Sequence, residues 1–269
     1  MTLMLDQPIT SKMLAEKDGA IGRVIFNNPA RHNAVSLEMW QAVAQIMEDF
    51  EADDAIRVIV LSGAGGKAFV SGADISRFEK EPSNEEAIAR YNEIVSKAND
   101  ALYHFPKPTI AMIRGYCIGG GLGLAVCCDL RIASDNSRFA IPAAKLGLGY
   151  GFPGIKRLSD LVGPSFTKEI FYTARQFDAA EALAMGLVNR VLPADGVETY
   201  VKDYAETIAG NAPLTVNAVK FIANETVREE SRRDPARCAA LVKRCFDSKD
   251  FIEGRRAFME KRKPAFTGA

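Results

Sequence analysis

The sequence predicts an α/β fold, with a parallel sheet in the first part of the chain and helices in the last third. Up to about residue 151, short apolar runs rich in β-branched residues alternate with segments of helical spacing. Such alternation favours parallel strands joined by right-handed crossovers. Beyond residue 151 helical segments dominate, and from about residue 199 the chain is almost entirely helical.

Turn and capping residues bound the first two elements. Residues 20–26 form an apolar run that stops at Asn27-Asn28-Pro29, which predicts a strand followed by a turn. Ser36 is a typical N-cap residue, so we expect a helix to begin directly after it. Apolar residues then recur with helical spacing at Leu37, Trp40, Val43, Ala44 and Met47.

The middle of the chain repeats the alternation. The apolar runs predict strands over 56–61, 109–113 and 130–134, and helices over 84–102 and 119–127. A glycine-rich loop occupies 62–72.

Capping residues organise the last part of the chain. Asp178, Asp195 and Thr215 predict three helix starts, and a short strand is expected over 187–192. We therefore divide the chain into a core of residues 1–198 and a C-terminal helical region of residues 199–269.

Composition excludes several classes of protein. The chain has 269 residues, with 34 Lys plus Arg against 34 Asp plus Glu, so no bulk attraction to nucleic acid or anionic membrane is expected. The five cysteines are odd in number and include no CxxC pair, which argues against a disulfide framework or a zinc site. We see no signal peptide and no apolar run long enough to cross a bilayer, and we expect a cytoplasmic protein.

Two glycine-rich loops carry the features that suggest chemistry. Each follows a predicted buried strand, one leading to Ala73 and the other to Gly120. Glycines at these points let a ligand approach the backbone, and in the second loop a helix begins among them. Free N–H groups and the positive end of a helix suit a developing oxyanion. The alternative is that these glycines serve only tight strand-to-helix turns.

Several segments resemble the crotonase (enoyl-CoA hydratase/isomerase) superfamily, over nearly the whole chain. They are NPARHNA at 28–34, FVSGADI at 69–75, GYCIGGG at 115–121, CDL at 128–130, AMGLV at 184–188, EGRRAF at 253–258 and EKRK at 260–263. The resemblance implies a crotonase-like spiral of ββα turns. It also implies a C-terminal helical trimerisation region, giving homotrimers or dimers of trimers.

The resemblance further implies an acyl-CoA thioester substrate, with no cofactor beyond the coenzyme A of the substrate and no metal. The matching positions make the N–H groups of Ala73 and Gly120 the oxyanion donors. The positions that match contacts to coenzyme A are Arg31, His32, Ala34, Ala73, Asp74, Ile75, Ser76, Phe258 and Lys261. In the family, the last two sometimes reach the site from a neighbouring subunit.

The sequence departs from the hydratase pattern at the two catalytic glutamates. Their matching positions hold Gly123 and Ala143, neither of which can move a proton. Hydration by a pair of carboxylates is therefore not expected. A glutamate on or before the helix at 84–102 is a candidate substitute: Glu79, Glu85, Glu86 or Glu93.

Tyr150 matches a tyrosine of the methylmalonyl-CoA decarboxylase branch, where loss of CO₂ leaves an enolate and a phenol supplies a proton. That branch has a histidine where this chain has Ala73, and Tyr150 could equally be a pocket-wall aromatic residue. Our main hypothesis is an enoyl-CoA hydratase-like enzyme that stabilises a thioester enolate. The alternatives are a malonyl-type acyl-CoA decarboxylase using Tyr150 and a non-catalytic acyl-CoA binding protein.

Overall fold

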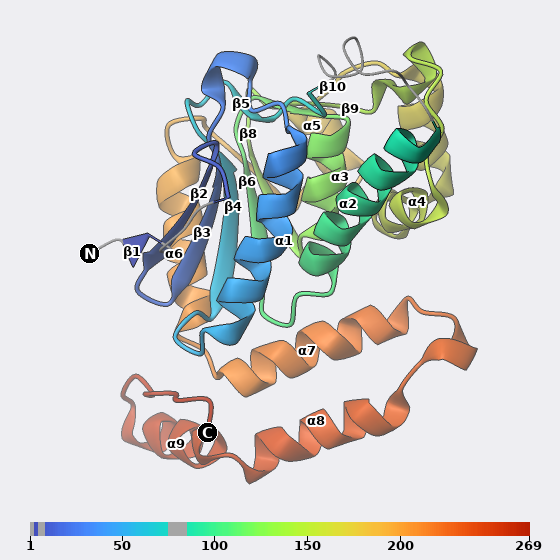
Figure 1. Ribbon diagram of the computed structural model, residues 1–269. Helices are drawn as coiled ribbons and strands as arrows, with labels where there is room; N and C mark the ends of the chain where they lie inside the picture. The colour runs from blue at the N-terminus through green and yellow to red at the C-terminus, as the bar shows by residue number, and fades with distance from the viewer. Residues whose placement is uncertain (1–2, 5–8, 75–84) are drawn as a thin grey trace.

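A large twisted sheet forms the centre of the computed structural model, which describes residues 3–4, 9–74 and 85–269 (Figure 1). Its first three strands are antiparallel and the rest run parallel. In spatial order the strands are β1 (Leu3–Met4), β2 (Met13–Asp18), β3 (Ile21–Phe26), β4 (Val58–Gly63), β6 (Thr109–Ile113), β8 (Leu130–Ser134) and β11 (Arg190–Leu192).

A second, smaller sheet consists of four short strands, of which β5, β7 and β9 each follow a strand of the large sheet and β10 follows α4. Its order is β10 (Phe177–Asp178), β9 (Arg138–Ala140), β7 (Tyr116–Ile118) and β5 (Ala68–Val70). The chain thus runs β4–β5–α2, β6–β7–α3 and β8–β9–α4. These are successive ββα turns, which confirms the predicted spiral.

Helices cover both faces of the large sheet. On one face lie α1 (Leu37–Ala52), α2 (Glu85–Tyr103) and α3 (Gly120–Cys127), and on the other lies α6 (Val197–Ala209) (Figure 1). Because both faces of the sheet are covered, successive side chains of β4 are buried alternately on one face and on the other. Ile59 and Leu61 belong to the core beneath α1, whereas Val58 and Val60 pack with α6.

The predicted boundaries are confirmed in part. Strands β6 and β8 match 109–113 and 130–134, α1 begins after Ser36, and Asp178 forms a capping box with Glu181. The predicted starts at Asp195 and Thr215 are wrong. Helix α6 has Gly196 as its N-cap, and α7 begins at a proline, whose fixed φ suits the first helical position.

The remaining helices lie toward the C-terminus. They are α4 (Phe152–Thr173), α5 (Ala179–Ala184), α7 (Pro213–Thr226), α8 (Pro235–Asp247) and α9 (Lys249–Glu260). Short 3-10 turns occur elsewhere along the described chain, at η1 (Pro29–Arg31), η3 (Pro142–Lys145) and η4 (Glu230–Arg232). Helix α4 bends at Gly163, whose φ is 75°. The expected division at residue 198 falls within α6 and stays a prediction.

Helices α7, α8 and α9 form a layer set off from the body (Figure 1). Arg57, on the body, binds the two segments that flank this layer, one before α7 and one after α9. Its Nη1 donates to the carbonyl of Ala209 at 3.0 Å and its Nη2 to the carbonyl of Phe266 at 2.7 Å. Lys220 of α7 adds a salt bridge to Asp129 at 2.8 Å.

Candidate active site

The first predicted donor, the N–H of Ala73, lies on a short extended segment after β5. Ala73 pairs with Val35 in an isolated parallel bridge. Val35 N–H donates to the carbonyl of Gly72 at 2.8 Å, and Asp74 N–H donates to the carbonyl of Val35 at 2.9 Å. Successive amides of an extended chain point to opposite sides. The N–H of Ala73 therefore points away from Val35.

The second predicted donor, the N–H of Gly120, is at the first residue of α3. The first N–H groups of a helix have no intrahelical acceptor. A Cβ built on Gly120 would lie 3.8 Å from the amide nitrogen of Ala73. The structure thus places the backbone at the start of α3 beside the amide nitrogen of Ala73.

Gly121 explains how α3 comes this close to the Ala73 segment. A Cβ at this position would lie 2.1 Å from the carbonyl oxygen of Val70, so only glycine fits. The preceding turn depends on Gly119, with a φ of 54°. The spacing between the two amides is therefore set by backbone packing of α3 against β5.

The positions of the expected glutamates lie in different surroundings. A Cβ built on Gly123, one turn into α3, would meet no heavy atom of the described residues within 4 Å. Ala143, in η3, is buried and 5% exposed. Neither position supplies a proton donor or acceptor. Of the candidate substitutes, Glu85, Glu86 and Glu93 are exposed, and Glu79 lies outside the described residues.

Tyr150 lies on the segment between η3 and α4 and packs partly buried against the main core. Its ring makes an edge contact with Phe171, with ring centroids 5.0 Å apart. Burial raises the pKa of the Tyr150 phenol, and the nearby phenol of Tyr91 raises it further. Tyr150 is therefore protonated at neutral pH and able to donate a hydrogen bond.

The predicted coenzyme A contacts on η1 meet the Ala73 segment. The guanidinium of Arg31 donates to both carboxylate oxygens of Asp74, at 2.9 and 2.8 Å. His32 adopts a left-handed conformation and makes an edge contact with Tyr116. The carbonyl of Ala34 accepts a hydrogen bond from the preceding turn. Ile75 and Ser76, predicted here too, lie outside the described residues.

Asn33 holds these segments together and was not among the predicted site residues. Its side chain is fully buried, and its Nδ2 donates to the carbonyls of Ala64 and Ala68 at 3.0 and 2.8 Å. Its Oδ1 accepts from the N–H of Asn28 at 2.9 Å. A positive φ of 57° at a non-glycine residue is one that asparagine tolerates better than most. Its place within the segment 28–34 was the available signal.

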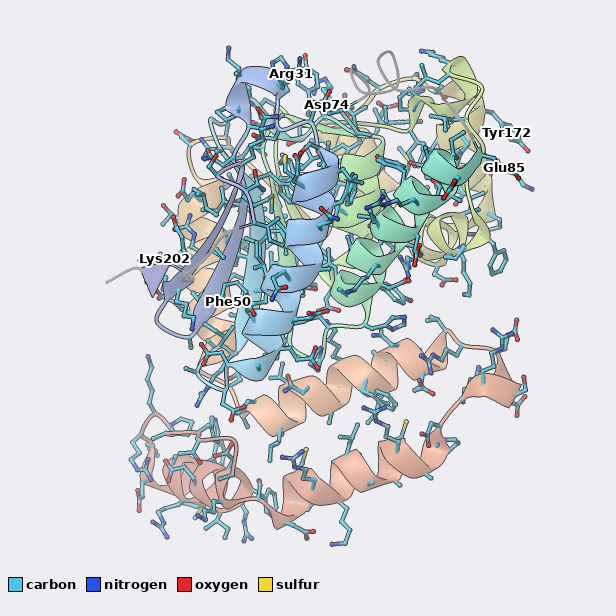
Figure 2. All side chains as sticks on the ribbon, viewed as in Figure 1. Arg31, Phe50, Asp74, Glu85, Tyr172 and Lys202 are labelled. Atoms are coloured by element: carbon cyan, nitrogen blue, oxygen red, sulfur yellow. The ribbon has the colours of Figure 1, made fainter. Side chains whose placement is uncertain are left out.

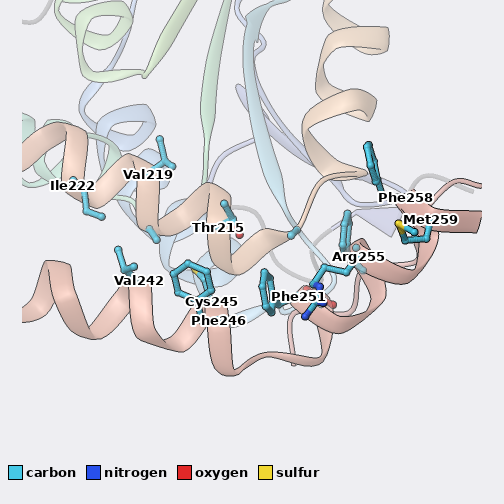
Figure 3. A pocket seen from close by; sticks show the side chains of 15 residues that line it. Thr215, Val219, Ile222, Val242, Cys245, Phe246, Phe251, Arg255, Phe258 and Met259 are labelled. Carbon is cyan, nitrogen blue, oxygen red and sulfur yellow. The ribbon is translucent and has the colours of Figure 1, made fainter. Parts of the chain in front are cut away.

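Phe258 and Lys261 lie at the other end of the molecule within one chain. Helix α9 is at the end opposite Arg31 and Asp74 (Figures 1 and 2). Phe258 is 82% exposed and lines an apolar cavity of about 910 Å³ between α7, α8 and α9 (Figure 3). The structure does not bring these two residues to Ala73 and Gly120 within a single chain.

Thiols are poor candidates for a nucleophile here. Cys117, Cys127 and Cys128 are buried, and burial raises the pKa of all three, that of Cys127 to about 11. They are therefore protonated at neutral pH. In the described part of the chain, no cluster of three metal-ligating side chains occurs. Nor does any helix in that part have the length and apolarity needed to cross a bilayer.

Comparisons with known proteins agree with this architecture. The family model for enoyl-CoA hydratase/isomerase matches residues 16–269. A short-chain-enoyl-CoA hydratase from Clostridium acetobutylicum is 35% identical over 253 residues, covering 94% of this chain and 96% of its own. A crotonyl-CoA hydratase from Syntrophomonas wolfei is 35% identical over 254 residues, covering 94% of this chain and 97% of its own.

A solved structure shares the whole fold. The crystal structure of an enoyl-CoA hydratase/carnithine racemase from Magnetospirillum magneticum superposes with a TM-score of 0.90 at 36% identity, covering 97% of each chain. Sequence and fold therefore agree over almost the entire length. The chain belongs to the enoyl-CoA hydratase/isomerase family, the crotonase superfamily, and is an enzyme of the hydratase/isomerase type.

Proposed function

We propose that this enzyme binds an acyl-CoA thioester and stabilises its enolate through the N–H groups of Ala73 and Gly120. The closeness of the Gly120 backbone, at the start of α3, to the amide nitrogen of Ala73 is the observation that supports the proposal. Two donors preorganised on a thioester oxygen stabilise the negative charge that develops there. Each such donor contributes on the order of a hundredfold to the rate in enzymes where it was removed.

The proton transfers in this proposal do not pass through the usual pair of glutamates. Gly123 and Ala143 stand at those positions, so classical hydration is not the reaction we favour. Among the described residues, no atom lies within 4 Å of the position of a Gly123 Cβ, which supports a role other than a packed core position.

Tyr150 supports malonyl-type decarboxylation as a second candidate. The bond between Cα and the carboxylate breaks, CO₂ leaves, and the electron pair forms the enolate held by the two amides. The Tyr150 phenol then protonates Cα and recovers its proton from water. The raised pKa of Tyr150 supports this role, because the proton is present at neutral pH. A binding protein without turnover is the third candidate, motivated by the same missing carboxylates.

The proposed coenzyme A site joins Arg31, His32, Ala34 and Asp74 to Ala73, with Ile75 and Ser76 following. We propose that Phe258 and Lys261 reach this site from a neighbouring copy, in a homotrimer or dimer of trimers. The exposed apolar side chains of α7 to α9 support such an assembly, because large exposed apolar patches mark interfaces.

We propose no cofactor beyond the coenzyme A of the substrate, and no nucleic-acid or membrane partner. A cytoplasmic location is supported by the five cysteines, all of which are unpaired.

A panel of thioesters tests the proposed function. Crotonyl-CoA, malonyl-CoA and an aryl-CoA are incubated with the enzyme, and products are followed by mass spectrometry. Binding is measured by calorimetry. Ala73→Pro removes one donor, and Ala73→Gly keeps it and serves as the matched control.

We expect turnover of at least one thioester, with Ala73→Pro lowering it about a hundredfold or more and Ala73→Gly retaining it. Binding without turnover of any thioester would favour the binding-only alternative. Absence of binding would refute the acyl-CoA proposal.

A further inference from the structure

A buried cation lies at the end of α3 opposite the proposed oxyanion site. Arg131, on β8, is 2% exposed. Its guanidinium donates to main-chain carbonyls only, those of Cys128 at 2.6 Å, Leu187 at 2.8 Å, Ala125 at 3.3 Å and Asp129 at 3.3 Å. Ala125 belongs to the last turn of α3, and Cys128 is its C-cap residue. Arg131 therefore binds the C-terminal end of the helix whose first residue is Gly120.

This end of α3 needs a donor from the protein. The last carbonyls of a helix have no intrahelical donor, and they carry the negative end of its dipole. Cys128 is 4% exposed, so water does not reach this end freely. A buried cation in turn costs several kcal/mol unless its N–H groups are bonded. The guanidinium of Arg131 and the end of α3 thus satisfy each other.

The backbone of Arg131 is itself fixed in the large sheet. Its N–H donates to the Oδ1 of Asn189 at 2.8 Å, and the N–H of Asn189 donates to the carbonyl of Arg131 at 2.8 Å. Asn189 directly precedes β11, which pairs with β8. The guanidinium therefore holds the end of α3 at a fixed point relative to the sheet.

Helix α3 is short enough for a hold on one end to decide where the other end lies. It has eight residues, six of them buried, and spans about 12 Å. Close packing at Gly121 limits how near α3 approaches β5. That contact fixes the sideways position of the helix, whereas a hold on its last carbonyls fixes its position along its own axis.

We propose that Arg131 is a positioning residue, which acts through α3 to hold the N–H of Gly120 in register with the N–H of Ala73. The inference rests on the proposed function, in which both groups bind one thioester oxygen. Arg131 does not touch the substrate. Without its guanidinium, the end of α3 moves toward other donors, and Gly120 moves with it. The alternative is that Arg131 stabilises the fold and has no effect on the site.

The polarisation of a bound thioester distinguishes these two roles. Cinnamoyl-CoA is the probe, because its carbonyl is conjugated to the ring and hydrogen bonds to the oxygen shift its absorbance to longer wavelength. The shift is recorded at saturation, with the dissociation constant measured by calorimetry. Wild type is compared with Arg131→Met, which removes the guanidinium and keeps an apolar side chain of similar length.

Lys107→Met is the matched control. The Nζ of Lys107 donates to the carbonyls of Phe50 at 2.8 Å and Asp53 at 2.7 Å, at the C-terminal end of α1. Both variants therefore remove a cation from the carbonyl end of a helix, and both should lower Tm. Only Arg131→Met removes it from the helix that begins at Gly120.

We expect Arg131→Met to lose at least half of the wild-type absorbance shift while binding cinnamoyl-CoA within about threefold of wild type. For any thioester that wild type converts, kcat should fall about tenfold or more, because small displacements of catalytic groups have effects of this size. Lys107→Met should keep the shift and kcat.

An equal shift in wild type and Arg131→Met would overturn the inference and leave the proposed function in place. An equal loss in Arg131→Met and Lys107→Met would also overturn it, since it would indicate general loosening of the fold. If wild type binds cinnamoyl-CoA without any shift, or does not bind it, the proposed function itself fails. Should Arg131→Met not fold, Arg131→Lys decides, because one amine cannot replace the planar fork of donors. A reduced shift supports the inference, and an unchanged one refutes it.

Discussion

Two glycines of the same short helix should respond in opposite ways to the same substitution. Gly121 and Gly123 both lie in α3, two residues apart. A Cβ at Gly121 would lie 2.1 Å from the carbonyl oxygen of Val70, whereas a Cβ at Gly123 would have no atom of the residues in 3–4, 9–74 and 85–269 within 4 Å. Gly121→Ala therefore forces α3 away from β5, and Gly123→Ala does not.

The structure sets the size of both effects. Ordinary contact begins at 3.4 Å, so Gly121→Ala requires the backbone to move by about 1.3 Å. Overpacking of this kind costs about 3 kcal/mol, which lowers Tm by roughly 6 °C or more in a chain of this size. Gly123→Ala gains helix propensity of about 0.8–1 kcal/mol and should raise Tm by about 2 °C.

Thermal unfolding and calorimetry with a CoA thioester test this pair. Displacing α3 moves Gly120 away from Ala73, so Gly121→Ala should also weaken thioester binding at least tenfold. Gly123→Ala is the matched control. If the two variants have the same Tm within 1 °C, the explanation of the α3 position by close packing is refuted.

Three further outcomes are expected. Lys220→Met leaves the partly buried Asp129 without its cation and should destabilise the fold by about 2–3 kcal/mol in urea unfolding; an unchanged midpoint contradicts this. Hydrogen bonds from Arg262 and a backbone amide lower the pKa of Glu253 from its usual value of 4.5 to about 2. The ionised carboxylate therefore contributes fully to the stability of the fold above pH 4.5, and this contribution is lost as the pH falls from 4.5 to 2. The stability difference between wild type and Glu253→Gln should therefore shrink as pH falls from 6 to 2.5, and a constant difference would disprove the pairing. Gly123→Glu should raise the rate of crotonyl-CoA hydration at least tenfold, measured as loss of the enoyl absorbance. An unchanged rate would contradict the proposal that position 123 corresponds to a catalytic glutamate of the hydratases.

The large sheet was predictable because its strands are long apolar runs. Residues 109–113 and 130–134 are fully or mostly buried, so their apolar character is continuous and their ends are sharp. The small sheet was not predicted. Its strands are two or three residues long, too short for any period to be recognised.

The candidate site was predictable from the sequence only where it is formed by backbone groups at glycine-rich turns. Glycine at 120 and 121 is visible in the sequence, and its meaning depends on close approach. Trp40 gave no such signal, because an aromatic residue at helical spacing predicts core packing. Its contact with the start of α3 becomes visible only when α1 is placed beside that helix.

Arg57 makes the attachment of the C-terminal layer depend on one side chain. Its guanidinium binds the carbonyl of Ala209, at the end of α6, and the carbonyl of Phe266, beyond α9. The N–H groups of Thr267 and Gly268 donate to Asp250, so the segment beyond α9 also folds back onto its own layer. Because one cation ties both flanks of the layer to the start of β4, a single substitution at Arg57 would loosen two attachments at once.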